Sequence, residues 1–107
     1  MKFYETSIFT SQIVDLISDE SYSELQIALI VNPEAGTLIQ RSRGLRKIRW
    51  RLPGKGKSGG IRVIYYLVQD EEIFLLYAYP KSNRENITAE QTRVLRRLVD
   101  QHLEDNE

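Results

Sequence analysis

The residues of this sequence best suited to chemistry on a phosphate group are Lys55, Lys57 and Arg62. Both lysines lie in residues 53–60, which contain four glycines and one proline. Such a stretch forms turns whose backbone can approach a ligand closely. A lysine among like charges has a lowered pKa and can act as a base near neutral pH, whereas arginine stays protonated and stabilises negative charge. Together these side chains could bind a phosphodiester and assist its cleavage.

A strongly basic segment surrounds these three residues. The whole chain carries 15 basic and 15 acidic residues, yet residues 36–69 contain nine basic residues and no aspartate or glutamate. A charge run is often only solvated surface, but an uncompensated positive field usually meets phosphates, a nucleic acid backbone or an acidic partner. The basic residues of the segment are Arg41, Arg43, Arg46, Lys47, Arg49, Arg51, Lys55, Lys57 and Arg62. The pattern therefore favours a polyanionic ligand.

The groups missing from this segment indicate how RNA could be cut. The segment has no cluster of carboxylates to hold a magnesium ion, and the only histidine of the chain, His102, lies far from it in the sequence. Cleavage would then use the 2′-OH of the RNA as nucleophile, with Lys55 or Lys57 as the base and Arg62 stabilising the charged phosphorane. Lys81 could add a further positive charge or act as the acid. The sequence thus predicts neither a metal nor a cofactor.

Two strands are expected to carry the basic segment. Residues 46–52 alternate between basic and apolar side chains, so one face of the strand would be cationic and the other would pack in the core. Residues 61–68 are apolar on both faces, as in a strand that is covered on both sides. The cationic face would present Lys47, Arg49 and Arg51, and the apolar face Ile48, Trp50 and Leu52. We therefore predict a long basic hairpin with the two lysines at its tip.

Further RNA contacts are expected where the next strand ends. Pro80 stops an apolar strand at residues 73–79, and loops at such positions commonly carry functional side chains. Tyr79 lies at this strand end, whereas the positions of Trp50 and His102 favour packing over function. The predicted RNA-binding residues are Arg46, Lys47, Arg49, Arg51, Tyr79 and Arg84.

The rest of the pattern indicates an opening strand at residues 2–5, two helices before the hairpin and one helix after it. Thr6 or Ser7 can cap the first helix. Ser21-x-x-Glu24 fits a capping box for the second helix, which Asn32-Pro33 should end. Thr88-x-x-Gln91 is a capping box for the last helix. The resulting order, βααβββα, predicts an α+β domain with a small antiparallel sheet that packs helices on one face.

Length and composition set further bounds. A chain of 107 residues with 41% hydrophobic content suits one compact domain, residues 1–107. The first 20 residues contain four acidic residues, so neither a signal peptide nor a membrane span is expected. Cysteine is absent, which excludes disulfides and thiolate chemistry. We therefore expect a cytoplasmic protein.

Three stretches carry a resemblance to a known family. They are residues 44–49 (GLRKIR), 54–66 (GKGKSGGIRVIYY) and 79–82 (YPKS). In this order and spacing they resemble the HigB/RelE-like toxins of bacterial type II toxin–antitoxin modules. The resemblance covers most of the chain, although family members often carry Lys-Asn-Glu where this chain has Lys81-Ser82-Asn83.

The resemblance implies a compact RelE-like fold and metal-independent cleavage of messenger RNA, usually in the ribosomal decoding site. It also implies a cognate antitoxin, HigA-like with a helix-turn-helix domain, through which the complex would bind operator DNA. An alternative is the related ParE-type toxins, which share the fold but poison DNA gyrase by binding it. The glycine-rich loop with its lysines favours phosphate contact over gyrase binding. A third possibility is an RNA- or ribosome-binding module without cleavage.

Overall fold

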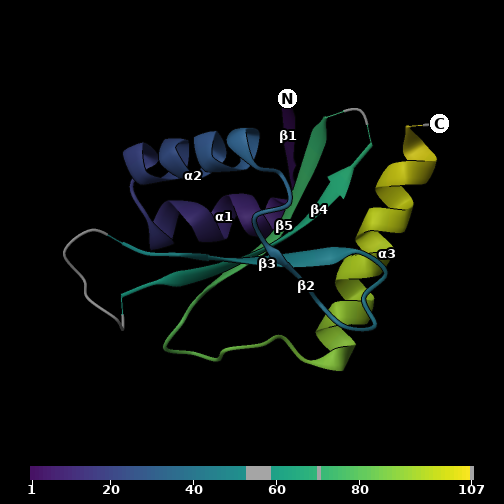
Figure 1. Cartoon of the computed structure of the whole chain (residues 1–107). Helices are drawn as coiled ribbons and strands as arrows, with labels where there is room; N and C mark the ends of the chain where they lie inside the picture. Colours follow the sequence, from purple (N-terminus) through teal and green to yellow (C-terminus); the bar gives the residue numbers. More distant parts are fainter. Residues whose placement is uncertain (53–58, 70, 107) are drawn as a thin grey trace.

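Five strands and three helices make up the part of the chain that the computed structural model describes, which is residues 1–52, 59–69 and 71–106 (Figure 1). The strands are β1 (Lys2–Glu5), β2 (Thr37–Leu38), β3 (Leu45–Trp50), β4 (Ile61–Val68) and β5 (Glu72–Pro80). The helices are α1 (Ser7–Leu16), α2 (Asp19–Val31) and α3 (Ala89–Asp105). This is the predicted α+β fold, with the short strand β2 as an element that was not expected.

The five strands form one sheet in the order β1-β5-β4-β3-β2. Strands β3, β4 and β5 are antiparallel neighbours, which confirms the two strands of the predicted hairpin. Strand β1 instead runs parallel to β5. The sheet is therefore mixed, whereas the prediction was a purely antiparallel sheet. The alternation of side chains is the same for either direction of a strand, and for this reason the sequence pattern could not reveal it. Lys55 and Lys57, at the predicted tip, lie outside the residues that the structure describes.

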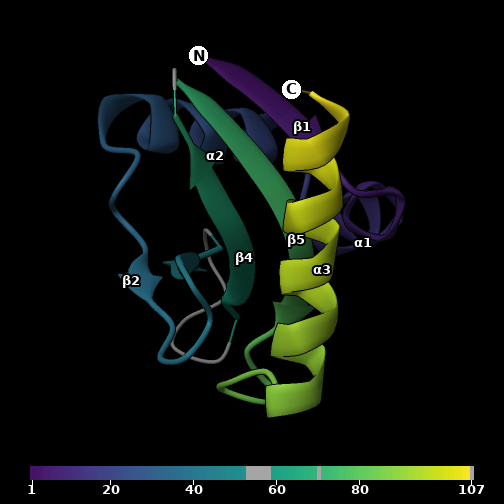
Figure 2. The ribbon, with the colours of Figure 1, turned by 90° about the vertical axis from the view of Figure 1, so that its right-hand side faces the viewer.

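Helices cover both faces of the sheet, whereas the sequence pattern suggested one. Helices α1 and α2 pack on one face, and α3 packs on the other (Figure 2). The core under α1 and α2 includes Phe9, Leu25 and Tyr65, and the core under α3 includes Ile64 and Leu95. The physical reason is the apolar character of β4 and β5 on both faces, since each face must be shielded from water.

A hydroxyl side chain caps the start of each of these three helices. Thr6 caps α1 and Thr88 forms the predicted capping box with Gln91 at the start of α3. The predicted cap of α2 was wrong: Ser18, not Ser21, accepts the hydrogen bond at its first turn. Ser21 lies within the helix, and its hydroxyl accepts a hydrogen bond of 3.1 Å from Nε1 of Trp50. Trp50 is therefore held in the core, as expected.

Candidate active site

A row of polar side chains crosses three strands on the face that α3 also occupies. Arg49 of β3 lies opposite Arg62 of β4, and Arg62 lies opposite Tyr79 of β5. Lys47 lies two residues before Arg49 and shares its face because side chains alternate along a strand. The sheet thus brings together four of the predicted site residues from separate parts of the sequence.

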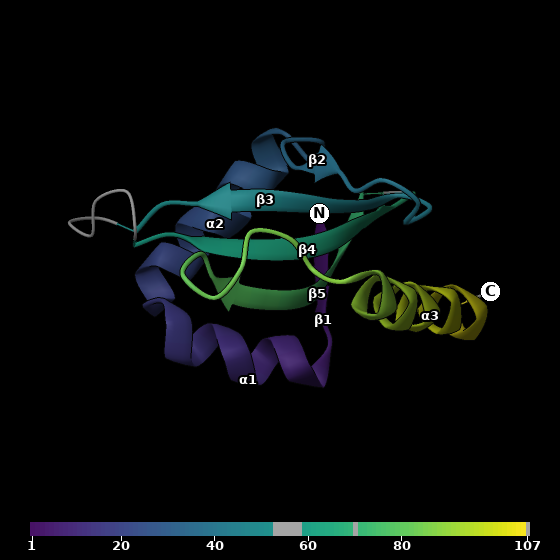
Figure 3. The ribbon, with the colours of Figure 1, turned by 90° about the horizontal axis from the view of Figure 1, so that it is seen from below.

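Glu85 closes this row from the segment that links β5 to α3. Its Oε2 accepts hydrogen bonds from Nε and Nη2 of Arg62, at 3.2 and 2.9 Å. Its Oε1 lies 2.6 Å from Nη2 of Arg49 and 3.5 Å from Nζ of Lys47. Figure 3 shows this segment, in light green, passing over β4 on the way to α3. The sequence suggested that the basic hairpin has no counter-charge. The structure shows that Glu85 supplies one.

The backbone around Glu85 is fixed by the same side chains. The hydroxyl of Tyr79 donates a hydrogen bond of 2.9 Å to the carbonyl oxygen of Glu85. Nζ of Lys47 donates to that carbonyl at 3.2 Å and to Oδ1 of Asn86 at 2.6 Å. Burial raises the pKa of the Tyr79 hydroxyl, which keeps it protonated as a donor. The carboxylate is consequently held over the row by a segment that is itself anchored to the row.

The charge state of Glu85 follows from these contacts. The hydrogen bond from Arg62 is the largest cause that lowers the pKa of Glu85 from 4.5 to about 2, and the hydrogen bond from Arg49 adds to it. The side chain of Arg62 is only 6% exposed, whereas that of Glu85 is 42% exposed. A guanidinium binds a carboxylate and a phosphate through the same pair of parallel N–H groups. The site can thus hold an anion at a position that faces solvent.

We predict a pH-dependent contribution of Glu85 to stability. The pKa of Glu85 is about 2 in the folded chain and 4.5 in the reference state, so folding is favoured while this carboxylate is ionised. The contribution is complete above about pH 4.5 and is lost as the pH falls towards about 2. Urea unfolding at a series of pH values should therefore show the free-energy difference between wild type and Glu85→Gln shrinking over this interval.

The matched control for this experiment is Glu24→Gln, because Glu24 is exposed on α2 and forms no ion pair among the residues that the structure describes. A difference between wild type and Glu85→Gln that stays constant from neutral to acidic pH would contradict the prediction.

Other predicted site residues lie around the row or away from it. Arg84 is exposed, and its Nη1 donates to Oε1 of Gln91 at 3.0 Å. Arg51 is exposed just after β3. The backbone N–H of Lys81 donates to the carbonyl oxygen of Gly60 at 2.9 Å, which places Lys81 beside the start of β4.

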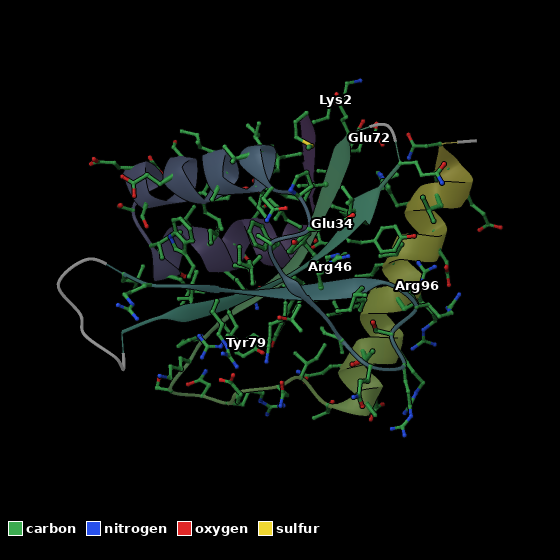
Figure 4. All side chains as sticks on the ribbon, viewed as in Figure 1. Lys2, Glu34, Arg46, Glu72, Tyr79 and Arg96 are labelled. Atoms are coloured by element: carbon green, nitrogen blue, oxygen red, sulfur yellow. The ribbon has the colours of Figure 1, made fainter. Side chains whose placement is uncertain are left out.

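Arg46, another predicted RNA contact, lies apart from the row. It lies on the opposite face of β3, as its parity with Ile48 requires, and Figure 4 shows it near Glu34. Its Nη1 donates to the carbonyl oxygens of Gly36 and Glu34, at 2.8 and 3.3 Å. Arg46 therefore fixes the loop before β2, and its contact with RNA stays a prediction.

His102 packs as expected. Its ring lies 4.8 Å from the ring of Tyr4 and 4.4 Å from the ring of Phe74, measured between centroids. Within residues 1–52, 59–69 and 71–106, no three histidine or carboxylate side chains are arranged to hold a metal ion. Over the same residues, no helix is both long and apolar enough to span a membrane.

Comparison with known protein families agrees with the resemblance seen in the sequence. The family model described as the RelE toxin of the RelE/RelB toxin–antitoxin system matches residues 8–107, which is nearly the whole chain. The match includes all of β3, β4 and β5 and the segment that carries Glu85. This chain therefore belongs to the RelE family of toxins from toxin–antitoxin systems.

Proposed function

We propose that this RelE-family toxin is an endoribonuclease that cuts messenger RNA on the ribosome and so inhibits translation. The observation that supports this most is the row of Arg49, Arg62 and Tyr79 closed by the carboxylate of Glu85. The row already binds an anion: two nitrogens of Arg62 contact Oε2 of Glu85, and Nη2 of Arg49 contacts its Oε1. A phosphate of the message would replace that carboxylate over the row.

The proposed reaction needs only groups of the protein and of the RNA. The 2′-oxygen of one nucleotide attacks the neighbouring phosphorus and gives its proton to Lys55 or Lys57. The bond from phosphorus to the 5′-oxygen breaks, and that oxygen receives a proton, for which we propose Lys81 as donor. The products are a 2′,3′-cyclic phosphate and a free 5′-hydroxyl. No metal or other cofactor takes part in this scheme.

In this scheme Arg62 stabilises the phosphorane because its two donor nitrogens can contact two non-bridging oxygens at once. Its near-complete burial keeps water away from those contacts and strengthens them. Lys47 and Arg49 would bind the neighbouring phosphate of the RNA, and Tyr79 holds the segment that carries Glu85 by donating to the carbonyl oxygen of that residue. Arg51 and Arg84, both exposed, extend the proposed RNA path beyond the row.

The proposed partners follow from this activity. The toxin would act in the cytoplasm on ribosomes that hold a message. An antitoxin, which we propose to be HigA-like with a helix-turn-helix domain, would bind the toxin and hold it inactive. Operator DNA would be contacted only through that antitoxin.

Primer extension on a defined message tests the proposal. The message is incubated with the purified protein, with and without 70S ribosomes, in magnesium-containing buffer that keeps the ribosomes intact. We expect discrete cuts in the sample with ribosomes and an intact message in the sample without them. Cuts in both samples would remove the ribosome requirement. An intact message in both samples, from protein that still stops growth, would contradict the proposal and direct the search to gyrase or another protein target.

A further inference from the structure

A second basic surface lies beside α3, outside the row that Glu85 closes. Here a cleft separates the loop between β2 and β3 from the first half of α3. Five arginines line it: Arg41 and Arg43 from the loop, and Arg93, Arg96 and Arg97 from the helix. Their guanidinium groups stay charged at any physiological pH. The fold thus gathers five positive charges from two separate parts of the sequence.

The charges of this cleft are only partly neutralised. Asp100 is the one acidic partner of these arginines among residues 1–52, 59–69 and 71–106. Its Oδ2 lies 3.1 Å from Nη2 of Arg43, and its Oδ1 lies 3.2 Å from Nη1 of Arg96. No ion pair is formed by Arg41, Arg93 or Arg97 with any residue in those ranges, and all three are exposed. An excess positive charge of this size favours a polyanion.

Arg96 gives the cleft a fixed cationic floor. Its guanidinium lies 5.0 Å from the centre of the Tyr66 ring, and its side chain is only 12% exposed. Its buried Nε has no hydrogen-bond partner among the residues that the structure describes. The Tyr66 ring and Asp100 thus hold the guanidinium of Arg96 in one position at the base of the cleft.

The loop side of the cleft is equally well fixed. Ser42 is buried, and its hydroxyl contacts the carbonyl oxygen of Ile39 at 2.6 Å and the backbone nitrogen of Leu45 at 3.0 Å. The neighbouring Arg41 and Arg43 have φ angles of 59° and 56°, in the left-handed region that side chains of this size rarely adopt. This turn therefore holds both arginines outwards at a cost in backbone strain.

We propose that this arginine cleft is a second phosphate-binding site, which holds the backbone of RNA while the row around Arg62 acts on the message. The inference rests on the proposed function, because it takes the polyanion to be RNA. A second hollow shares Gln40, Ala89 and Thr92 with the cleft and is also lined by Lys47 of the row, so the two sites are neighbours. One RNA strand can therefore contact both sites. The phosphates could belong to the message or to ribosomal RNA, and the experiment below separates these sources.

The test compares RNA binding by wild type and by the triple variant Arg41→Ala, Arg93→Ala, Arg97→Ala. The probe is a labelled single-stranded RNA of roughly 12 nucleotides, methylated at every 2′-oxygen so that it cannot be cut. Each phosphate contact on a single strand contributes about 0.7 to the slope of log affinity against log salt, so the variant should lose about 2 from this slope. Its affinity at about 0.1 M salt should fall by at least about tenfold.

A matched pair of variants controls for net charge. Arg97→Glu and Lys2→Glu change the charge equally, but Lys2 lies on β1 at the far edge of the sheet. Only Arg97→Glu should weaken binding by more than about twofold. Thermal unfolding of each variant shows whether the chain stays folded, which is expected because the replaced side chains are exposed.

Sedimentation with message-free ribosomes provides the second arm. Weaker binding of the triple variant to the oligonucleotide assigns the cleft to the message, and weaker binding only to ribosomes assigns it to ribosomal RNA. The proposal is overturned if the triple variant binds both like wild type, if wild type binds neither, or if only binding of the antitoxin changes. Binding is measured without cleavage, so a wild type that binds through the cleft but never cuts the message would contradict the proposed nuclease alone.

Discussion

Replacing Arg62 with alanine is expected to lower cleavage of a ribosome-bound message by about 100-fold or more, the usual effect of removing a group that stabilises charge in the transition state. Arg62 is the buried centre of the cationic row, and both of its contacts to Glu85 come from nitrogens that could contact phosphate oxygens instead. The measurement is the rate of primer-extension product with saturating ribosomes. Saturation separates the chemical step from weaker binding of the message.

Two further variants keep this prediction open to contradiction. Arg62→Lys retains the charge but cannot contact two oxygens through a planar group, so it should lose less activity than Arg62→Ala but remain impaired. Lys2→Ala removes a basic residue at the far edge of the sheet and should cleave like wild type. Thermal unfolding identifies any loss that comes from misfolding of the buried site. A folded Arg62→Ala protein that cuts at the wild-type rate would contradict the proposed role of Arg62 in stabilising the phosphorane.

The sequence pattern predicted the hairpin because its two signals are local. The alternation in residues 46–52 separates cationic from apolar side chains, and the doubly apolar run at residues 61–68 requires a covered strand. The same apolar run indicates that helices must cover both faces of the sheet, although the order βααβββα alone suggested helices on one face. The direction of β1 and the two-residue strand β2 leave no such signal, since pairing partners decide both.

The site was predicted in part, and the missing part depends on contacts between distant residues. Alternation along β3 correctly placed Lys47 and Arg49 on one face, whereas Arg46, a predicted RNA contact, lies on the other. The register of the sheet, which the sequence did not show, adds Arg62 to the face of Lys47 and Arg49. Glu85 was missed because it lies 36 residues from Arg49 in the sequence and 23 from Arg62. The signal that was available is the position of Glu85 next to Arg84 in the segment after β5. Because β5 is antiparallel to β4, this segment starts at the end of the sheet where β4 begins and can return over the strands.

Glu85 has two opposite effects on the proposed function. It orders the row, because three cations in one place repel each other unless an anion lies between them. It also competes with any phosphate, because the phosphate must displace the carboxylate from the same nitrogen atoms. The exposure of Glu85, at 42% of its side chain, makes this exchange sterically possible without opening the core.

Replacing Glu85 with glutamine should therefore tighten RNA binding while it destabilises the fold. A phosphate that reaches the row no longer has to displace an anion, so the affinity for the 2′-methylated oligonucleotide should rise by about tenfold. The free energy of unfolding should fall at neutral pH, because the ionised carboxylate no longer offsets the repulsion among Lys47, Arg49 and Arg62. Fluorescence anisotropy and urea unfolding measure the two effects on the same protein.

The opposite signs of these two effects are what identify a competing anion. A glutamate that served the fold alone would, when lost, disorder the row and weaken RNA binding together with stability. Glu24→Gln changes the net charge equally on exposed α2 and controls for non-specific attraction of RNA, so it should leave the affinity within about twofold of wild type. Equal or weaker RNA binding by Glu85→Gln would show that phosphate does not occupy the position of the carboxylate, and the RNA path would then have to avoid Arg62.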